Sequence, residues 1–297
     1  MRPSDLVARK MKKILVTGAT GQVGSELKVL APSYSQLDWV FADRSVLDLS
    51  DLKAISQVLD EIQPQIIINC AAYTAVDKAE TETELADILN HQAVAVLAQW
   101  SHSNGCQLVH ISTDYVFDGN SNSALSEEAP TGPINVYGQT KLAGELACLR
   151  ENPMAIIIRT SWVYSAFGTN FVKTMSKLMQ ERDSLNVVND QIGSPTYAAD
   201  LAQTILTIIK HPNWQAGIYH YSNEGEISWY EFAIAIQEIG GFQCEITGIP
   251  STDYPTPARR PKYSLLDKSK IATTFAVEVP EYRESLQKCM KLIRVNS

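Results

Sequence analysis

A threonine, a tyrosine and a lysine in this sequence form a set that could assist the reduction of a ketone. Tyr137 and Lys141 are four residues apart, so a helix would place them on one face, where the ammonium could lie beside the phenol and favour its ionised form. Thr113 ends an apolar stretch, and its hydroxyl could hydrogen-bond the same substrate oxygen as negative charge develops there. These three residues are the candidate catalytic residues.

A glycine-rich turn near the start of the sequence predicts a nucleotide site. Residues 13–17 are typical of a short buried strand and run directly into Gly18-Ala-Thr-Gly-Gln-Val-Gly24, after which a helix is expected. Glycines permit backbone angles and close approaches that side chains forbid, so a pyrophosphate could lie against main-chain N–H groups at the helix N-terminus. Contacts with a cofactor are expected here from Gly18, Thr20, Gly21, Gln22, Val23 and Gly24.

A second apolar strand, residues 39–42, ends in Asp43, nineteen residues beyond Gly24. An acidic side chain there would meet the adenosine ribose hydroxyls, whereas the guanidinium of Arg44 could pair with a 2′-phosphate. Asp43 and Arg44 together therefore do not indicate a preference for NADH or NADPH, and we expect the protein to use both cofactors. Further cofactor contacts are expected at Asp48, Leu49, Ala71, Ala72 and Tyr73.

Short apolar strands alternate with helices in the first half of the sequence. Strands are expected at residues 13–17, 39–42, 66–71, 107–111 and 155–158, and helices at 84–103, around Tyr137 and Lys141, at 169–181, at 198–210 and from the capping box at Ser228 to Gly240. This pattern predicts an α/β fold with a Rossmann-type, doubly wound parallel sheet. The expected domains are residues 11–160 with 188–223 for NAD(P) and residues 161–187 with 224–297 for substrate, the second being smaller and also α/β. Residues 1–10 are expected to be a disordered extension.

Composition excludes several other classes of protein. The net charge of −8 leaves no surplus of basic residues for duplex nucleic acid. The five cysteines are scattered and suit a reduced cytoplasm rather than a disulfide framework. No apolar run reaches the roughly 18 to 20 residues that span a bilayer, and the start does not resemble a signal peptide. The five histidines show no metal-ligand spacing.

Six segments resemble a known family: residues 21–24, 71–80, 112–117, 135–145, 159–164 and 189–196. The family is that of the extended short-chain dehydrogenase/reductases, whose members act on nucleotide sugars. The similarity covers nearly the whole sequence from about Met11 onward, and within the family it is greatest to reductases of dTDP-linked 4-keto sugars.

The resemblance implies hydride transfer from NADPH or NADH to the C4 ketone of dTDP-4-dehydro-L-rhamnose, giving dTDP-L-rhamnose for cell-surface polysaccharide such as the O-antigen of lipopolysaccharide. Tyr137 would protonate the alkoxide, Lys141 would bind the nicotinamide ribose, and Thr113 would brace the carbonyl oxygen. The implied substrate contacts are Thr113, Asp114 beside the sugar, Trp162, and Arg260 on the diphosphate. From the residues alone, Asp114 could equally form a turn, Trp162 pack for its bulk, and Arg260 remain solvated.

The resemblance also implies Mg²⁺ dependence and a homodimer. The metal ligands stay undetermined; Glu26 and Asp200 are candidate carboxylates, although Glu26 is expected to be solvated on the first helix.

Three rival functions would share parts of these motifs. A 4,6-dehydratase uses a glutamate for the elimination of water at the position that Tyr115 occupies here, and a phenol cannot readily replace that carboxyl group. A 4-epimerase would keep its cofactor tightly bound and return the hydride to the sugar. A regulatory subunit of methionine adenosyltransferase would act without catalysis, and the presence of Thr113, Tyr137 and Lys141 does not exclude it. The sequence leaves the sugar stereochemistry and the nucleotide base open.

Overall fold

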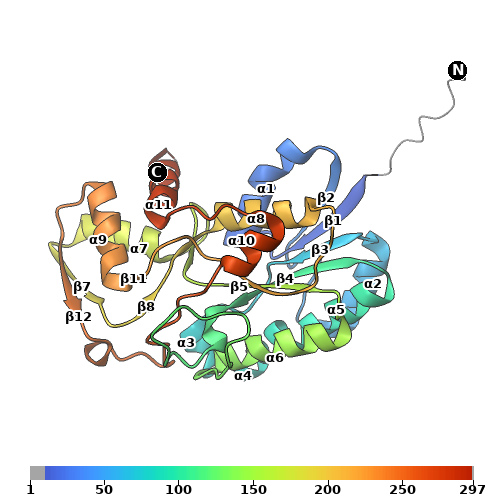
Figure 1. The fold of residues 1–297 in the computed structure, drawn as a ribbon, viewed down its shortest axis with the longest axis horizontal. Helices are drawn as coiled ribbons and strands as arrows, with labels where there is room; N and C mark the ends of the chain where they lie inside the picture. The colour runs from blue at the N-terminus through green and yellow to red at the C-terminus, as the bar shows by residue number, and fades with distance from the viewer. Residues whose placement is uncertain (1–10, 296–297) are drawn as a thin grey trace, which may run out of the picture.

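A six-stranded parallel sheet lies at the centre of the computed structural model, which describes residues 11–295 (Figure 1). Its strands, in spatial order, are β10 (Gly217–His220), β5 (Ile156–Thr160), β4 (Gln107–Thr113), β3 (Ile66–Asn69), β1 (Lys12–Thr17) and β2 (Leu37–Ala42). All neighbouring pairs are parallel. The expected doubly wound α/β class is confirmed, whereas the expectation for residues 1–10 lies outside the described residues.

Helices cover both faces of the sheet, and for this reason its central strands are almost wholly apolar. One face packs against α1 (Gln22–Leu30), α8 (Ala198–Lys210) and α10 (Ser269–Phe275). The other face packs against α2 (Leu52–Ile62), α5 (Ala93–Ser103) and α6 (Val136–Glu151). In Figure 1 the two groups lie above and below the sheet. Every residue of β3 and of β5 is buried, as strands covered on two faces require.

The strand order reverses between β1 and β3. The connection after β1 leads outward to β2 at the sheet edge, whereas the connections after β3 lead the other way, to β4 and β5. In doubly wound sheets, ligands bind beyond the carboxyl ends of the strands at such a switch point. The glycine turn that follows β1 lies at this point, and we call the space above it the crevice.

A third hydrophobic core lies apart from the sheet. It is formed by α7 (Phe171–Glu181), α9 (Trp229–Gly240) and α11 (Tyr282–Val295), with β7 (Ser184–Val188) paired in parallel to β12 (Glu245–Ile249). Two short ladders join the sheet side to this region: β6 (Val163–Tyr164) with β9 (Thr196–Tyr197), and β8 (Ile192–Gly193) with β11 (Ile227–Ser228). The helix α10 belongs to the sheet side, because its apolar residues pack in the core of the sheet.

The helix boundaries follow local signals. The predicted capping box is present at the start of α9, where Ser228 and Glu231 bond each other's backbone N–H groups. The helix expected at residues 84–103 consists of α4 (Thr83–Asp87), a π-helical turn (Ile88–Gln92) and α5. The short helices are η1 (Ala31–Tyr34), α3 (Val76–Ala79), η3 (Asp114–Val116) and η4 (Ser251–Asp253). Across residues 11–295, no helix combines the length and the apolar character needed to cross a membrane.

Candidate active site

The glycine turn packs tightly against the end of β3 and leaves the start of α1 open. Gly18 has a φ of +63°, in the left-handed region that favours glycine, and a Cβ there would lie 2.7 Å from the backbone nitrogen of Ala71. A Cβ at Gly24 would lie 2.4 Å from the carbonyl oxygen of Gly18. Gly21 and Thr20 are exposed, and Gly21 as N-cap puts no side chain over the first N–H groups of α1. A phosphate could therefore bind these groups.

Several expected cofactor contacts have side chains that are engaged elsewhere. Gln22 Nε2 donates to the carbonyl oxygen of Val163, at 3.1 Å. The side chain of Val23 packs in the core on one face of the sheet, and those of Leu49 and Tyr73 pack in the core on the other. At these three positions the cofactor contacts are therefore expected from backbone atoms.

The residues after β2 are exposed and polar. The Asp43 carboxylate accepts hydrogen bonds from the hydroxyl (2.6 Å) and the backbone N–H (2.9 Å) of Ser45, and these bonds lower the pKa of Asp43. Arg44 is exposed beside it. Asp48 makes the same pair of bonds with Ser50. The end of β2 therefore presents one ionised carboxylate and one guanidinium to solvent.

Thr113 and Tyr137 meet where β4 ends and α6 begins. The Thr113 hydroxyl lies near enough to the Tyr137 phenol to oppose the rise in its pKa, and both side chains are buried. Thr113 Oγ1 also donates to Asp114 Oδ1, at 3.1 Å. Asn135 caps α6 by accepting from the N–H of Gly138, at 2.7 Å, which fixes where the helix starts and so where the phenol lies.

Lys141 lies against β4 and not against the phenol, contrary to the argument from sequence. Its Nζ donates to the carbonyl oxygen of Ile111 at 2.7 Å and lies 3.4 Å from Nε2 of His110. Burial lowers the pKa of Lys141 to about 8, opposed by the carboxylate of Glu145. Burial also raises the pKa of Tyr137 to about 12, so the expected lowering is wrong for this structure. The spacing places both residues on one helix face but does not decide which partner the amine meets.

The phenol is nevertheless suited to donate a proton. With a pKa of about 12, Tyr137 stays protonated at neutral pH, which is the state that a general acid requires.

Asp114 supplies a buried acceptor beside Thr113. Among the described residues, its Oδ2 has no hydrogen-bond partner. Burial raises the pKa of Asp114 to about 6, opposed by the nearby hydroxyls of Ser264 and Thr113. A buried polar atom without a partner is costly, and a ligand hydroxyl would satisfy it.

Trp162 is held in an uncommon conformation near the end of β5. Its φ is +49°, and its indole stacks on that of Trp229 with the ring centroids 3.7 Å apart and the planes 14° apart. A Cβ at Gly193 would lie 3.0 Å from the Trp162 ring. Such strain in a non-glycine residue persists only where the surroundings enforce it. The aromatic residue predicted to contact substrate is therefore fixed in orientation.

Arg260 lines a cavity of about 660 Å³ between α7, β7 and residues 249–260. Its guanidinium pairs with both carboxylate oxygens of Asp77, at 2.7 and 3.1 Å. Arg182, Tyr254 and Trp229 also line the cavity. Its size is that of a small-molecule site, and this lining suits a planar ring joined to an anionic group.

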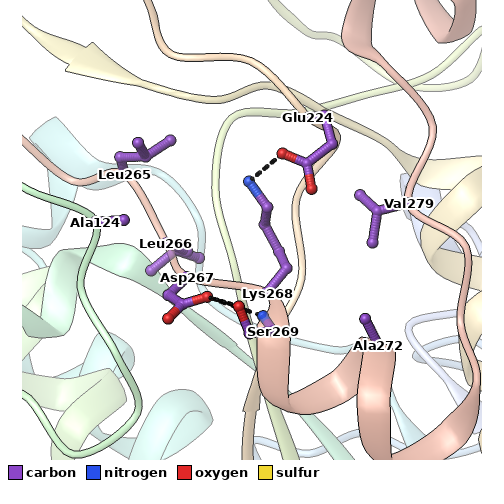
Figure 2. A pocket seen from close by; sticks show the side chains of 9 residues that line it. All are labelled: Ala124, Glu224, Leu265, Leu266, Asp267, Lys268, Ser269, Ala272 and Val279. Carbon is purple, nitrogen blue, oxygen red and sulfur yellow. Dashed lines mark hydrogen bonds and ion pairs between the residues drawn. The ribbon is translucent and has the colours of Figure 1, made fainter.

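A smaller cavity of about 400 Å³ lies beside α10 (Figure 2). Its charged groups already have partners. Lys268 forms an ion pair with Glu224 at 3.1 Å, and Asp267 accepts a hydrogen bond from the hydroxyl of Ser269 at 2.6 Å. None of the predicted site residues lines it. We therefore place the candidate site at the crevice and the larger cavity.

The two candidate metal ligands are engaged in hydrogen bonds. Glu26 is buried, not solvated as expected, because it accepts from the Ser165 hydroxyl at 2.6 Å where α1 meets residues 163–170; burial raises its pKa. Asp200 accepts from Asn223, at 2.8 Å, and from Ser285. Within residues 11–295, no three His, Cys, Asp or Glu side chains cluster as a metal site.

Comparison with known proteins supplies the family. The model of the RmlD substrate binding domain matches residues 11–295. The chain belongs to the RmlD family. The dTDP-4-dehydrorhamnose reductase of Aggregatibacter actinomycetemcomitans is 39% identical over 93% of this chain and 98% of the relative. The dTDP-4-dehydrorhamnose reductase of Escherichia coli K12 is 40% identical over 93% of this chain and 96% of the relative. The crystal structure of the Bacillus anthracis dTDP-4-dehydrorhamnose reductase in complex with NADP matches with a TM-score of 0.90 and 39% identity, covering 94% of this chain and 99% of that one.

Four residues of this RmlD-family site were not predicted from the sequence. They are His110 beside Lys141, Ser264 beside Asp114, Trp229 against Trp162, and Asp77 on Arg260. Two of them carried a signal in the sequence: Asp77 lies within the family segment of residues 71–80, and Trp229 directly follows the capping residue of α9.

Proposed function

We propose that this chain catalyses the NAD(P)H-dependent reduction of the C4 ketone of dTDP-4-dehydro-L-rhamnose, giving dTDP-L-rhamnose for cell-surface polysaccharide. Membership of the RmlD family over residues 11–295 supports this proposal. The structural observation that carries it is the meeting of Thr113 and a protonated Tyr137 at the carboxyl edge of the sheet whose switch point holds the glycine turn.

In this proposal the N–H groups at the start of α1 hold the cofactor pyrophosphate, and Lys141 holds the nicotinamide ribose. Bound NAD(P)H would supply the hydride. Tyr137 gives its proton to the oxygen at C4, and the Thr113 hydroxyl turns from Asp114 Oδ1 to donate a hydrogen bond to the same oxygen as its charge grows. The phenol starts protonated, so no other group has to deliver a proton first.

The sugar is proposed to lie between Asp114 and Trp162, and the dTDP portion to occupy the 660 Å³ cavity that Arg260 lines. Asp114 Oδ2 would accept from a sugar hydroxyl. This arrangement divides the molecule into a cofactor domain, residues 11–160 and 188–223, and a substrate domain, residues 161–187 and 224–297, with α10 of the second segment packed on the sheet of the first.

The test measures NADPH absorbance with dTDP-4-dehydro-L-rhamnose and, in parallel, with its epimers. One NADPH should be oxidised per sugar reduced, and dTDP-glucose with NAD⁺ should give no 4-keto-6-deoxy product. Product formed without net NADPH loss would contradict the proposal, since an epimerase or a dehydratase regenerates its cofactor. An absence of turnover with every 4-keto nucleotide sugar would favour the regulatory-subunit function.

Two tyrosine-to-phenylalanine variants distinguish an effect on catalysis from an effect on folding. Tyr137→Phe should lower kcat by about a hundredfold or more, because general acid catalysis contributes roughly 10² to 10⁴, while the Kd for NADPH changes little. Tyr219→Phe removes a phenol that donates to the carbonyl oxygen of Gln215, away from the proposed site, and should keep the parent rate. Equal rates in the two variants would remove Tyr137 from the reaction.

The finer parts of the proposal are tested in the same assay. NADPH and NADH should both serve, and Arg44→Ala should raise the KM for NADPH about tenfold while sparing NADH, since a charge-assisted hydrogen bond contributes roughly 1.5 to 3 kcal/mol. Mg²⁺ dependence, for which no ligands are assigned, is checked by comparing rates in EDTA and in MgCl₂. A homodimer acting in the cytoplasm is the proposed form, and light scattering reports its mass.

A further inference from the structure

Four buried polar side chains connect the end of β1 to Lys141. Thr17 Oγ1 donates to Asn69 Oδ1 at 2.6 Å, Asn69 Nδ2 lies 3.0 Å from His110 Nδ1, and His110 Nε2 lies 3.4 Å from Lys141 Nζ. All four residues are at most 1% exposed. We call these residues the polar row. Because they are shielded from water, each donor in the row must find its acceptor within it or on the adjoining backbone.

The orientation of Asn69 fixes the direction of donation along the row. Its amide nitrogen faces His110 Nδ1, so Nδ1 accepts and the proton of the neutral ring lies on Nε2. Nε2–H then points at Lys141 Nζ, which can accept only as a neutral amine with a lone pair. At the other end, Thr17 gives its proton to Asn69 and accepts from the N–H of Ala71, at 3.4 Å. Each of the four side chains then has at least one hydrogen-bond partner.

When Lys141 is charged, the hydrogen bonds along the polar row must be donated in the opposite direction. An ammonium has three donors and no acceptor, so Nε2 of His110 must accept and the ring proton must lie on Nδ1. Asn69 must then present its oxygen to the ring and its amide nitrogen to Thr17. The charge on Lys141 and the direction of the whole row are therefore linked.

The surroundings keep the ring of His110 neutral in both arrangements. Burial holds the pKa of His110 well below its usual value, and the charge of Lys141 lowers it further. The titratable groups facing Lys141 are His110 from β4 and, on α6 itself, Glu145 and Cys148. Glu145 is paired with Arg159 of β5.

We propose that His110 is a positioning residue for Lys141, and that loss of the lysine proton moves the ring proton from Nδ1 to Nε2 and reverses the polar row as far as Thr17. The two states differ by one proton, which passes to solvent, and the ring carries one proton in each. Thr17 directly precedes Gly18, and its hydroxyl accepts from Ala71. The charge of the lysine is thereby linked to both strand ends that border the crevice, whatever substrate the chain takes.

The test is NMR on the whole protein labelled with ¹⁵N-histidine and with ¹³Cε-lysine. The shifts of the two ring nitrogens report which of them carries the proton, and loss of signals in His110→Gln and Lys141→Met assigns the two residues. Between pH 6 and 10, the protonated nitrogen of His110 should change from Nδ1 to Nε2 with the same midpoint as the Lys141 Cε shift. A single tautomer over this range, or two different midpoints, would overturn the proposal.

A variant of Asn69 tests the direction of the row. In Asn69→Asp the carboxylate can only accept, so the ring proton should stay on Nδ1 at every pH and Lys141 should keep its proton to higher pH. Thr17→Ser retains the hydroxyl and should retain the tautomer change. A change of tautomer that persists in Asn69→Asp would also overturn the proposal. The unsubstituted protein decides the question by itself if that variant does not fold.

Discussion

Removing one partner of the ion pair between Glu145 of α6 and Arg159 of β5 should cost several kcal/mol of stability, whereas breaking a pair of nearly the same length within α6 should cost little. Glu145 Oε2 lies 2.7 Å from Arg159 Nη2, with side chains 1% and 3% exposed, and the guanidinium makes two further bonds to the carboxylate. Arg150 and Glu151 lie 2.8 Å apart, but their side chains are 65% and 29% exposed. Burial is therefore the variable that separates the two pairs.

Glu145→Gln leaves a charged guanidinium in the interior without its counter-charge. Breaking a buried pair costs about 3 to 5 kcal/mol, whereas an exposed pair contributes about 0 to 1 kcal/mol. Urea unfolding followed by circular dichroism should give these losses in the free energy of unfolding for Glu145→Gln and for Glu151→Gln, with unchanged m-values. The double variant Glu145→Gln/Arg159→Met should recover part of the loss, because it removes the orphaned charge. Similar losses in the two single variants would refute the reasoning.

Three further predictions concern the site. Because burial lowers the pKa of Lys141 to about 8, the ammonium that would hold the nicotinamide ribose is present below that pH and lost above it. The KM for NADPH should therefore increase as the pH rises through about 8, and a KM that stays constant to pH 10 would be inconsistent with this role. Burial raises the pKa of Asp114 to about 6, so the KM for the sugar should increase as the pH falls through 6 in the parent and not in Asp114→Asn, and identical profiles would argue against the sugar contact. Arg260→Ala should raise the Kd for dTDP by about tenfold in calorimetry, a charge-assisted bond contributing roughly 1.5 to 3 kcal/mol, and an unchanged Kd would show that Arg260 serves only its pair with Asp77.

Local sequence patterns were sufficient to predict the glycine turn and five of the six strands of the sheet, but not β10 at its edge. The strand before Gly18, the turn itself and the start of α1 depend on neighbouring residues, and so does the capping box of Ser228 and Glu231. The same holds for the start of α6, where Asn135 accepts from the N–H of Gly138. Interactions that close within three or four residues leave a signature in the order of the residues.

Contacts between distant segments were not predictable in this way. The spacing of Tyr137 and Lys141 is local, but the partner of the amine, His110, lies on a strand 31 residues earlier. Arg260 and Asp77 are 183 residues apart, so the pairing of that guanidinium depends on how two separate loops meet. Burial shifts the pKa values of these groups, and burial is a property of the packed molecule, not of a motif.

The route of the chain also sets the order in which a newly synthesised molecule can fold. The strands β1 to β5 are complete once residue 160 has left the ribosome, so most of the sheet can pair early. In contrast, β7 waits for β12, and the third core waits for α11 near the C-terminus. Until β12 and α11 have been synthesised, the nascent chain displays an unpaired strand and the apolar side chains of that core, which are the features that chaperones and proteases recognise. The region that lines the 660 Å³ cavity is therefore open to misfolding for longer during synthesis than the sheet is.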